Sequence, residues 1–449
     1  ISDDFYKLIE MWKEIYQGLH KPWNVETITT INGTKKRDRD TLNMAKIVSQ
    51  ELAMLVFNGK CEIYTSDDEL TDNIQKILDD NAFDTKFQNY LEFQFAMGGM
   101  VIKPFMNPKN KLQLSYVTAD NFIPISWDNK NIYEAVFPVR TVKKDSVFTL
   151  LEWHLWEEDR YVIRNELYKA EKNSAELGKR VSLEALYPDL DEETYIDDLE
   201  YPLFVYFQPA TANYIETELP LGVPIYAHVL PTLNMINEIY NSYMREFRLG
   251  KRRIIVPTTA VQMVPDENNG GMLRRFFDDN DEVYEGMDIG DMDNNKIVDN
   301  SVGLRIQEHI DGLNHQLNIL SAACGFSAGT FTFDSGGIKT ATEVVSENSK
   351  TFRTKQSHEN IIEAQLKQLV AVIVQMADLY NIFPTPNKEY DVSVMFDDSI
   401  AEDKTAETDR EVLLVDKKMT TKVRALMKIH QITEEEAIKM KEEIDEESA

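Results

Sequence analysis

Two short patterns between Gly325 and Lys350 contain residues whose types could do chemistry. The first, GFSAG, matches G-x-S-x-G, the pattern in which a hydrolase holds its nucleophilic serine. That pattern needs a strand before the serine and a helix directly after it, whereas the sequence predicts a helix before Ser327 and more loop after it. The second, GGIKT, resembles the end of a phosphate-binding loop, but Ile338 separates the glycine and lysine that such a loop keeps adjacent. Neither pattern supports an enzyme.

Acidic residues and histidines elsewhere could bind a metal ion. The segment DMDNNKIVDNSV begins like a calcium-binding loop. However, Lys296 stands where that loop needs a glycine, and Val302 where it needs a bidentate glutamate. His309 and His315 lie six positions apart, so a helix would carry them on different faces. We therefore predict no metal, no cofactor and no catalytic residue.

The composition indicates a globular protein of two or more domains. The chain has 449 residues, of which 43% are hydrophobic. The longest purely apolar run, Leu369 to Val374, is far shorter than the ~20 residues of a membrane helix, so no membrane contact is predicted. Cys61 and Cys324 are the only cysteines, which fits a reducing compartment better than a disulfide framework. The numbered sequence begins with Ile1, and we expect a longer protein around it.

The formal net charge of −29 constrains any role that involves nucleic acid. Duplex DNA carries about one negative charge per 1.7 Å of its axis, and proteins that grip it supply Lys and Arg. Two interpretations stay open. The charge either serves solubility alone, or it provides a surface that does not hold phosphate.

The hydrophobic periodicity predicts an α+β fold. Helical spacing covers residues 2–18, 40–60, about 68–80 and 84–97. Six strand-like segments follow up to residue 208, separated by Asn, Asp, Lys and Pro as in antiparallel meanders. The first part of the chain therefore combines helices with antiparallel sheet.

After Pro224 the pattern changes to long helices. A helix over about 229–249 is followed by an acidic excursion, and a second helix over about 303–323 carries apolar residues at heptad-like spacing. Thr340 and Glu343 form a capping box that begins a long helix, which could extend to about Tyr380. Its first half offers little to bury, so we expect it beside water or polar neighbours. A strand near 390–396 and two short helices end the chain.

This order of elements resembles the portal proteins of tailed bacteriophages, specifically long-tailed phages of Gram-positive hosts. The resemblance spans nearly the whole chain. The segments that carry it are NMAKIVSQELAMLVFNGK, AHVLPTLNMINEIYNSYMREF and GTFTFDSGGIKTATEVVSENSKT. It implies a ring, usually a dodecamer, at one capsid vertex, through which double-stranded DNA passes during packaging and ejection without sequence readout. It also implies contacts with the terminase large subunit, a head-tail adaptor, and the major capsid and scaffolding proteins. The implied location is the virion, and the host cytoplasm during assembly. The alternative is another acidic virion or assembly scaffold without a DNA channel.

The resemblance also implies an assignment of the portal regions, with further crown residues expected beyond this sequence. The regions are wing 1–222, stem helix 1 223–250, clip 251–300, stem helix 2 301–324, tunnel loop 325–340, long helix and wing strand 341–404, and crown 405–449.

Three groups of residues follow as candidate sites. The DNA channel would be lined by the tunnel loop, at Thr330, Phe331, Thr332, Phe333, Asp334 and Ser335. Ring and stem packing would use Ile236, Tyr240, Tyr243, Phe247, Ile306, Ile310, Leu313 and Leu317. A basic patch between stem and clip would consist of Arg245, Arg248, Lys251, Arg252 and Arg253. Two questions stay open: whether the loop phenylalanines contact neighbouring loops or anchor to the wing, and whether the patch pairs with an acidic neighbouring subunit or contacts DNA.

Overall fold

A computed structural model of the chain describes most of its residues. The described residues are 3–30, 33–57, 61–129, 131–158, 160–172, 174, 176–250, 254–255, 262–266, 272–276, 298–299, 303–332, 349–385, 390–396, 412–413, 415, 417, 420–430, 437–438 and 440–441. They form two compact units, which are treated separately. The first unit contains Ile1–His20, Asn43–Leu233 and Asn318–Ala449, and the second contains Lys21–Leu42 and Asn234–Leu317.

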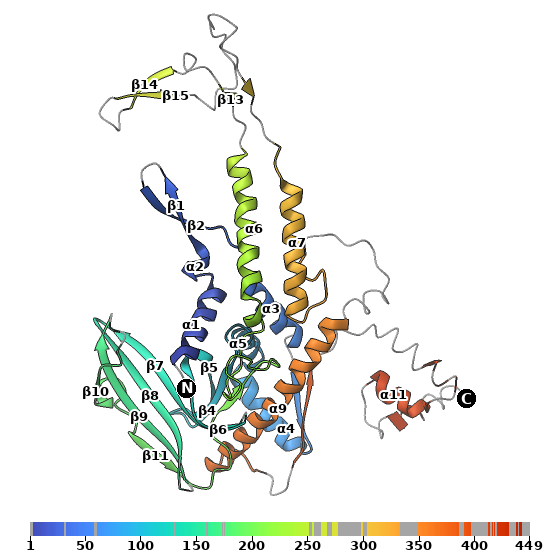
Figure 1. The fold of residues 1–449 in the computed structure, drawn as a ribbon. Helices are drawn as coiled ribbons and strands as arrows, with labels where there is room; N and C mark the ends of the chain where they lie inside the picture. Colours follow the sequence, from blue (N-terminus) through green and yellow to red (C-terminus); the bar gives the residue numbers. More distant parts are fainter. Residues whose placement is uncertain are drawn as a thin grey trace, which may run out of the picture. The chain divides into compact units, whose positions relative to one another are not determined.

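Helices near the start of the chain pack into the core of the first unit (Figure 1). Their bounds are α1 Asp3–Gln17, α3 Met44–Val56, α4 Asp68–Asp80 and α5 Phe83–Met97. In α1 the buried positions Phe5, Ile9 and Trp12 recur at helical spacing, as the sequence predicts. The helix α4 begins where the Asp67 carboxylate accepts the backbone N–H groups of Glu69 and Leu70.

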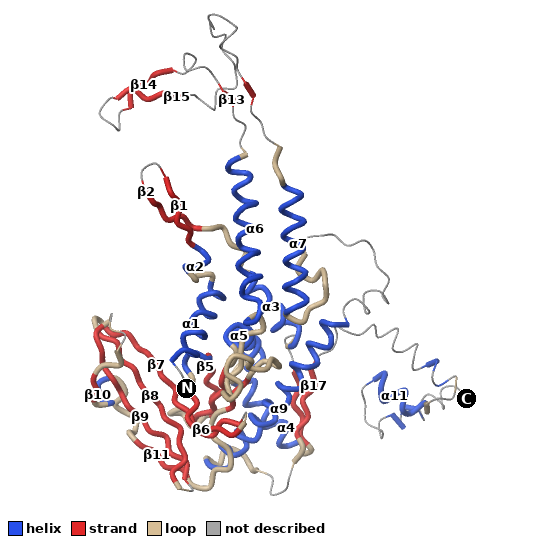
Figure 2. Tube along the Cα trace, viewed as in Figure 1, coloured by secondary structure: helices blue, strands red, loops and turns tan. Residues whose placement is uncertain are grey.

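Antiparallel sheets form another large part of the first unit (strands are red in Figure 2). The largest sheet has the order β10-β9-β8-β7-β6, with β11 also paired to β9. A second sheet has the order β12-β4-β5, and β17 pairs with β3. The strands are β3 Cys61–Thr65, β4 Met100–Met106, β5 Leu112–Thr118, β6 Ile123–Asp128, β7 Asn131–Lys143, β8 Ser146–Glu157, β9 Arg160–Glu171, β10 Lys179–Val181, β11 Glu193–Ile196, β12 Val205–Phe207 and β17 Val392–Phe396. Short 3-10 turns are η1 Ala119–Asn121, η2 Leu183–Ala185 and η3 Ala227–Val229. The predicted combination of helices with antiparallel sheet is confirmed.

The long helix α9 spans Ser349–Leu379 and packs against α3, β12 and β17. Its second half buries apolar residues, as predicted. Its first half borders water at most of its described positions, as expected, but Lys355, His358 and Glu359 on one face are buried. Lys355 and Glu359 pair at 3.0 Å with side chains only 4% and 5% exposed. The buried face of this half thus carries an ion pair whose charges satisfy one another, while most of the other described positions face solvent.

The second unit is built around parts of two long helices, α6 Leu230–Leu249 and α7 Ile306–Ala323 (Figure 1). A short helix α2, Lys21–Asn24, leads into an antiparallel hairpin of β1 Val25–Thr30 and β2 Gly33–Asp38. In the predicted clip, β13 Ile254–Ile255 pairs with β16 Val298–Asp299, and β14 Gln262–Asp266 pairs with β15 Met272–Phe276. Both described pairs are antiparallel.

Near the end of the chain, α11 covers Lys422–His430. The capping box at Thr340 and Glu343 lies outside the described residues. None of the described helices is long and apolar enough to cross a membrane.

Candidate functional site

The two long helices of the second unit form an antiparallel pair. Arg305 donates to the Glu246 carboxylate at 2.9 Å, and His309 Nε2 lies 3.0 Å from the Ser242 hydroxyl. The contacts move back along α6 by one turn as they move forward along α7, which defines an antiparallel arrangement. Hydrogen bonds from Arg305 hold the pKa of Glu246 below its ordinary value. The Arg305 side chain is 66% exposed and that of Glu246 is 17% exposed, so water screens the pair from the arginine side, and the pair orients the helices more than it stabilises them.

Most of the predicted packing residues are at least partly buried, to very different degrees. Ile236 and Leu317 are fully buried, and Leu313 is nearly so. Phe247 is 42% exposed, although its ring meets that of Tyr243 edge-on at 5.0 Å. The remaining predicted positions are half-buried, namely Tyr240, Tyr243, Ile306 and Ile310. A single chain therefore covers the side chains of Ile236 and Leu317 fully, whereas it leaves much of Phe247 exposed.

Two buried asparagines on α6 hold the segment that follows the β1–β2 hairpin. The side-chain oxygen of Asn241 accepts the backbone N–H of Asp40 at 3.3 Å, and that of Asn237 accepts the N–H of Leu42 at 3.1 Å. Arg248 adds an ion pair with Asp40 at 2.9 Å. Sequence reasoning missed both the hairpin and this attachment.

A small cavity of about 420 Å³ with charged walls lies beside these contacts. One residue of the predicted basic patch lines it. Arg245 lines the cavity together with Arg39, Arg305 and acidic residues that include Glu238 and Glu246. Arg39 lies 3.7 Å from the Glu238 carboxylate. Of the predicted basic patch, Arg248 therefore pairs with an acid of the same chain, and Arg245 shares a cavity with acids of the same chain. Lys251, Arg252 and Arg253 lie outside the described residues.

The first residues of the predicted tunnel loop are anchored in the first unit. Gly325 has φ +86°, and a Cβ at this position would lie 2.5 Å from the Thr354 hydroxyl, which donates to the Gly325 carbonyl at 2.7 Å. The N–H of Gly329 donates to the side-chain oxygen of Asn318 at 2.8 Å. Burial raises the pKa of the neighbouring Cys324 thiol to about 12, so this thiol stays protonated.

Three of the six predicted loop residues are described. The Thr330 hydroxyl donates to the Ser327 carbonyl at 2.7 Å, and the Thr332 hydroxyl donates to the Gly329 carbonyl at 3.1 Å. The Phe331 ring meets the buried ring of Phe326 edge-on at 5.0 Å. Within one chain Phe331 therefore anchors the loop. The other three predicted residues, Phe333, Asp334 and Ser335, lie outside the described residues.

The environment of Ser327 is that of a structural residue. Its side chain is buried, and its oxygen accepts from the Thr351 hydroxyl at 3.1 Å. The Thr351 hydroxyl oxygen in turn accepts the Ser327 N–H at 2.8 Å. In the described part of the chain, Ser327 hydrogen-bonds with Thr351 and Thr330, and neither is a base that could activate it, whereas a serine nucleophile needs one.

The family of the chain follows from a comparison with protein-family models. The model described as "Phage portal protein, SPP1 Gp6-like" matches residues 1–449. No curated protein sequence matches the chain.

Proposed function

The chain belongs to the SPP1 Gp6-like phage portal proteins, and on that premise we propose that it assembles into a dodecameric ring whose central channel conducts double-stranded DNA. The family is structural rather than enzymatic, and it implies an oligomeric ring at the portal vertex of the virion. The match covers the whole chain, which leaves no reason to retain a separate class of acidic scaffold. In the proposed role, DNA enters the capsid through the ring during packaging and leaves through it during ejection.

The incomplete packing of the α6/α7 pair is the observation that supports a ring. In the single chain Phe247 is 42% exposed, Leu249 is 55% exposed and Leu304 is 39% exposed. Apolar side chains that gather at one end of a helix pair are typical of a surface that a neighbouring subunit covers. We assign α6 and α7 to the stem, residues 251–300 to the clip and 325–340 to the tunnel loop.

The acidic balance supports a channel that conducts DNA without holding it. Each Lys or Arg that contacts phosphate adds salt-dependent attraction, so a wall that carries few of them offers weak grip. The described loop residues Thr330 and Thr332 present small polar groups, whose hydroxyls already bond within the loop.

The clip is the proposed docking surface for the terminase large subunit and later for the head-tail adaptor. Arg252 and Arg253 of the basic patch would either pair with an acidic neighbouring subunit or contact DNA. Reversing both charges separates these roles, because a loss of rings indicates a subunit contact, whereas normal rings with defective packaging indicate DNA contact.

Cryo-electron microscopy and native mass spectrometry of the purified protein test the central proposal. A dodecameric mass and a ring with a central hole are expected. A protein that stays monomeric in every buffer would contradict the ring.

A further inference from the structure

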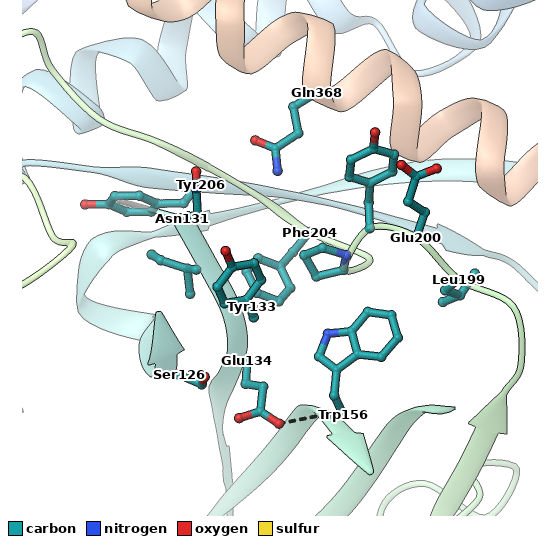
Figure 3. Close-up of a pocket in the computed structure, with 13 residues that line it drawn as sticks. Ser126, Asn131, Tyr133, Glu134, Trp156, Leu199, Glu200, Phe204, Tyr206 and Gln368 are labelled. Carbon is teal, nitrogen blue, oxygen red and sulfur yellow. Dashed lines mark hydrogen bonds between the residues drawn. The ribbon is translucent and has the colours of Figure 1, made fainter. Parts of the chain in front are cut away.

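A cavity of about 850 Å³ lies in the first unit, away from the predicted stem and loop. Figure 3 shows side chains reaching it from three parts of the chain: strands β6 to β8, the segment 199–206, and α9 through Gln368. A cavity of this size fits a small organic ligand or the end of a long side chain. Nothing in the proposed channel uses it.

Aromatic side chains form much of its wall, and other parts of the fold hold them in place. Tyr133 is 41% exposed and so presents much of its ring to solvent. The Trp156 ring meets Tyr161 edge-on at 4.9 Å. The Tyr206 hydroxyl accepts the N–H of Gly222 at 2.9 Å and donates to the Gly98 carbonyl at 3.2 Å. The fold therefore fixes the positions of Trp156 and Tyr206 before any ligand binds.

Two carboxylates lie on opposite sides of these rings (Figure 3). One oxygen of Glu134 accepts the backbone N–H of Trp156 at 2.7 Å, which fixes the direction of that carboxylate. Glu200 lies on the other side, and a hydrogen bond to its carboxylate raises the pKa of Tyr201. Among the described residues that line the cavity, none is Lys, Arg or His.

This combination selects the charge of a ligand. The cavity carries two negative charges without a basic side chain in its wall, inside a protein whose net charge is already −29. An anion would be repelled. The faces of aromatic rings attract cations, most strongly for tryptophan, and an alkyl chain would cover apolar ring surface at the same time.

We propose that this cavity binds a primary alkylammonium group, with its charge beside Glu134 or Glu200 and its carbon chain against Tyr133 and Trp156. The group can come from a free diamine or from a lysine side chain of a partner protein. Because one chain supplies the whole site, the proposal does not depend on ring formation.

Isothermal titration calorimetry of the purified full chain tests the proposal. The probes are 1,4-diaminobutane, Nα-acetyl-lysine methylamide and the neutral isostere 1,4-butanediol. We expect saturable binding of at least one cationic probe and none of the diol. Tighter binding of the diamine would identify a free diamine as the source, and tighter binding of the lysine derivative would identify a protein side chain.

Isosteric variants locate the binding. Glu134→Gln keeps an oxygen that can accept the Trp156 N–H, and Glu200→Gln likewise keeps an acceptor, so both should fold. Removing one charge should weaken binding about tenfold or more. Tyr133→Leu should also weaken it, since it removes an exposed ring. The matched control is Glu192→Gln, an exposed acid of the same unit outside the cavity wall, which should bind like the unmodified protein.

Three results would each overturn the proposal. The first is that neither cationic probe binds saturably. The second is that the diol binds as tightly as the diamine, because charge would then not be recognised. The third is that Glu192→Gln weakens binding as much as Glu134→Gln does, because the probes would then be acting as counter-ions of the whole surface.

Discussion

His358 is a buried histidine whose pKa the fold lowers. It lies on α9, its ring meets Phe95 edge-on at 5.0 Å, and its Nδ1 accepts the backbone N–H of Ala210 at 3.0 Å. Burial lowers its pKa from the ordinary 6.5 to about 4. As the pH falls below 6.5, the unfolded chain therefore takes up a proton before the folded chain does. The stability associated with His358 is complete above about pH 6.5 and is lost progressively as the pH falls to about 4.

We predict that His358→Asn flattens this pH dependence. The asparagine oxygen can replace Nδ1 as the acceptor for Ala210 but does not titrate. Between pH 7 and pH 4, unmodified protein should lose up to about 3 kcal/mol more unfolding free energy than the variant. Urea unfolding at several pH values measures the difference. Burial also lowers the pKa of His154, but this residue is present in both proteins, so the comparison isolates His358. Equal pH slopes in the two proteins would contradict the assignment.

Asn241 carries a second prediction at the scale of single residues. Its side-chain oxygen accepts the N–H of Asp40, so Asn241→Leu leaves a partly buried donor unsatisfied. We expect a loss of about 1–3 kcal/mol and faster amide hydrogen exchange at residues 33–42. The control is Asn234→Leu, the same chemical change on α6 at a side chain whose amide donates to Glu238 of the same helix. Unchanged exchange in Asn241→Leu would show that the hairpin does not depend on α6.

At the scale of elements, long periodic segments could be predicted from the sequence and contact-dependent ones could not. The bounds of α4 match the predicted 68–80, because its apolar positions keep one period and Asp67 caps its start. The hairpin of β1 and β2 was missed, although Asn32-Gly33 is a common hairpin signal. Its strands are mostly polar, and its attachment depends on two asparagines about 200 positions away in the sequence. Similarly, the burial of Lys355 and Glu359 follows from tertiary contacts, which a hydrophobic pattern does not report.

The α6/α7 pair supports a prediction about the packing of α7. Leu317 is fully buried, so Leu317→Asp places a carboxylate where water cannot reach it. We expect a loss of at least about 3 kcal/mol, together with the loss of rings. Ile319→Asp is the matched control, since Ile319 on the same helix is 40% exposed. Thermal unfolding and native mass spectrometry report the two effects. Normal rings and normal stability in Leu317→Asp would refute the role of this position.

At the scale of the whole molecule, the net charge of −29 and the anchored loop bear on how DNA would pass. A ring of such subunits repels phosphate. At about 0.1 M salt this repulsion is largely screened beyond a Debye length of about 10 Å. Because that long-range term is screened, short-range contacts between DNA and the channel wall would set how easily DNA moves through the ring. The wall proposed here is the tunnel loop, whose described base is held by Asn318 and Thr354 and whose Phe331 packs inward.

Basic side chains on this loop should slow DNA. We predict that the combined change Thr330→Lys, Thr332→Lys and Asp334→Lys leaves rings intact but slows or stalls packaging. The new ammonium groups would attract phosphate, and that attraction grows as salt is lowered, so the defect should be greatest at low ionic strength. Packaging assays with purified rings, terminase and DNA at several salt concentrations measure it.

A neutral variant separates charge from loop geometry. Thr330→Val and Thr332→Val together remove the two hydroxyl bonds within the loop without adding charge. If the lysine effect is electrostatic, the valine variant should package at a rate that depends on salt as the unmodified protein does. If the lysine variant packages normally at low salt, DNA does not contact this loop, and the channel wall must instead lie on the stem helices. If both variants fail equally at every salt concentration, the loop acts through its folded shape and not through its charge.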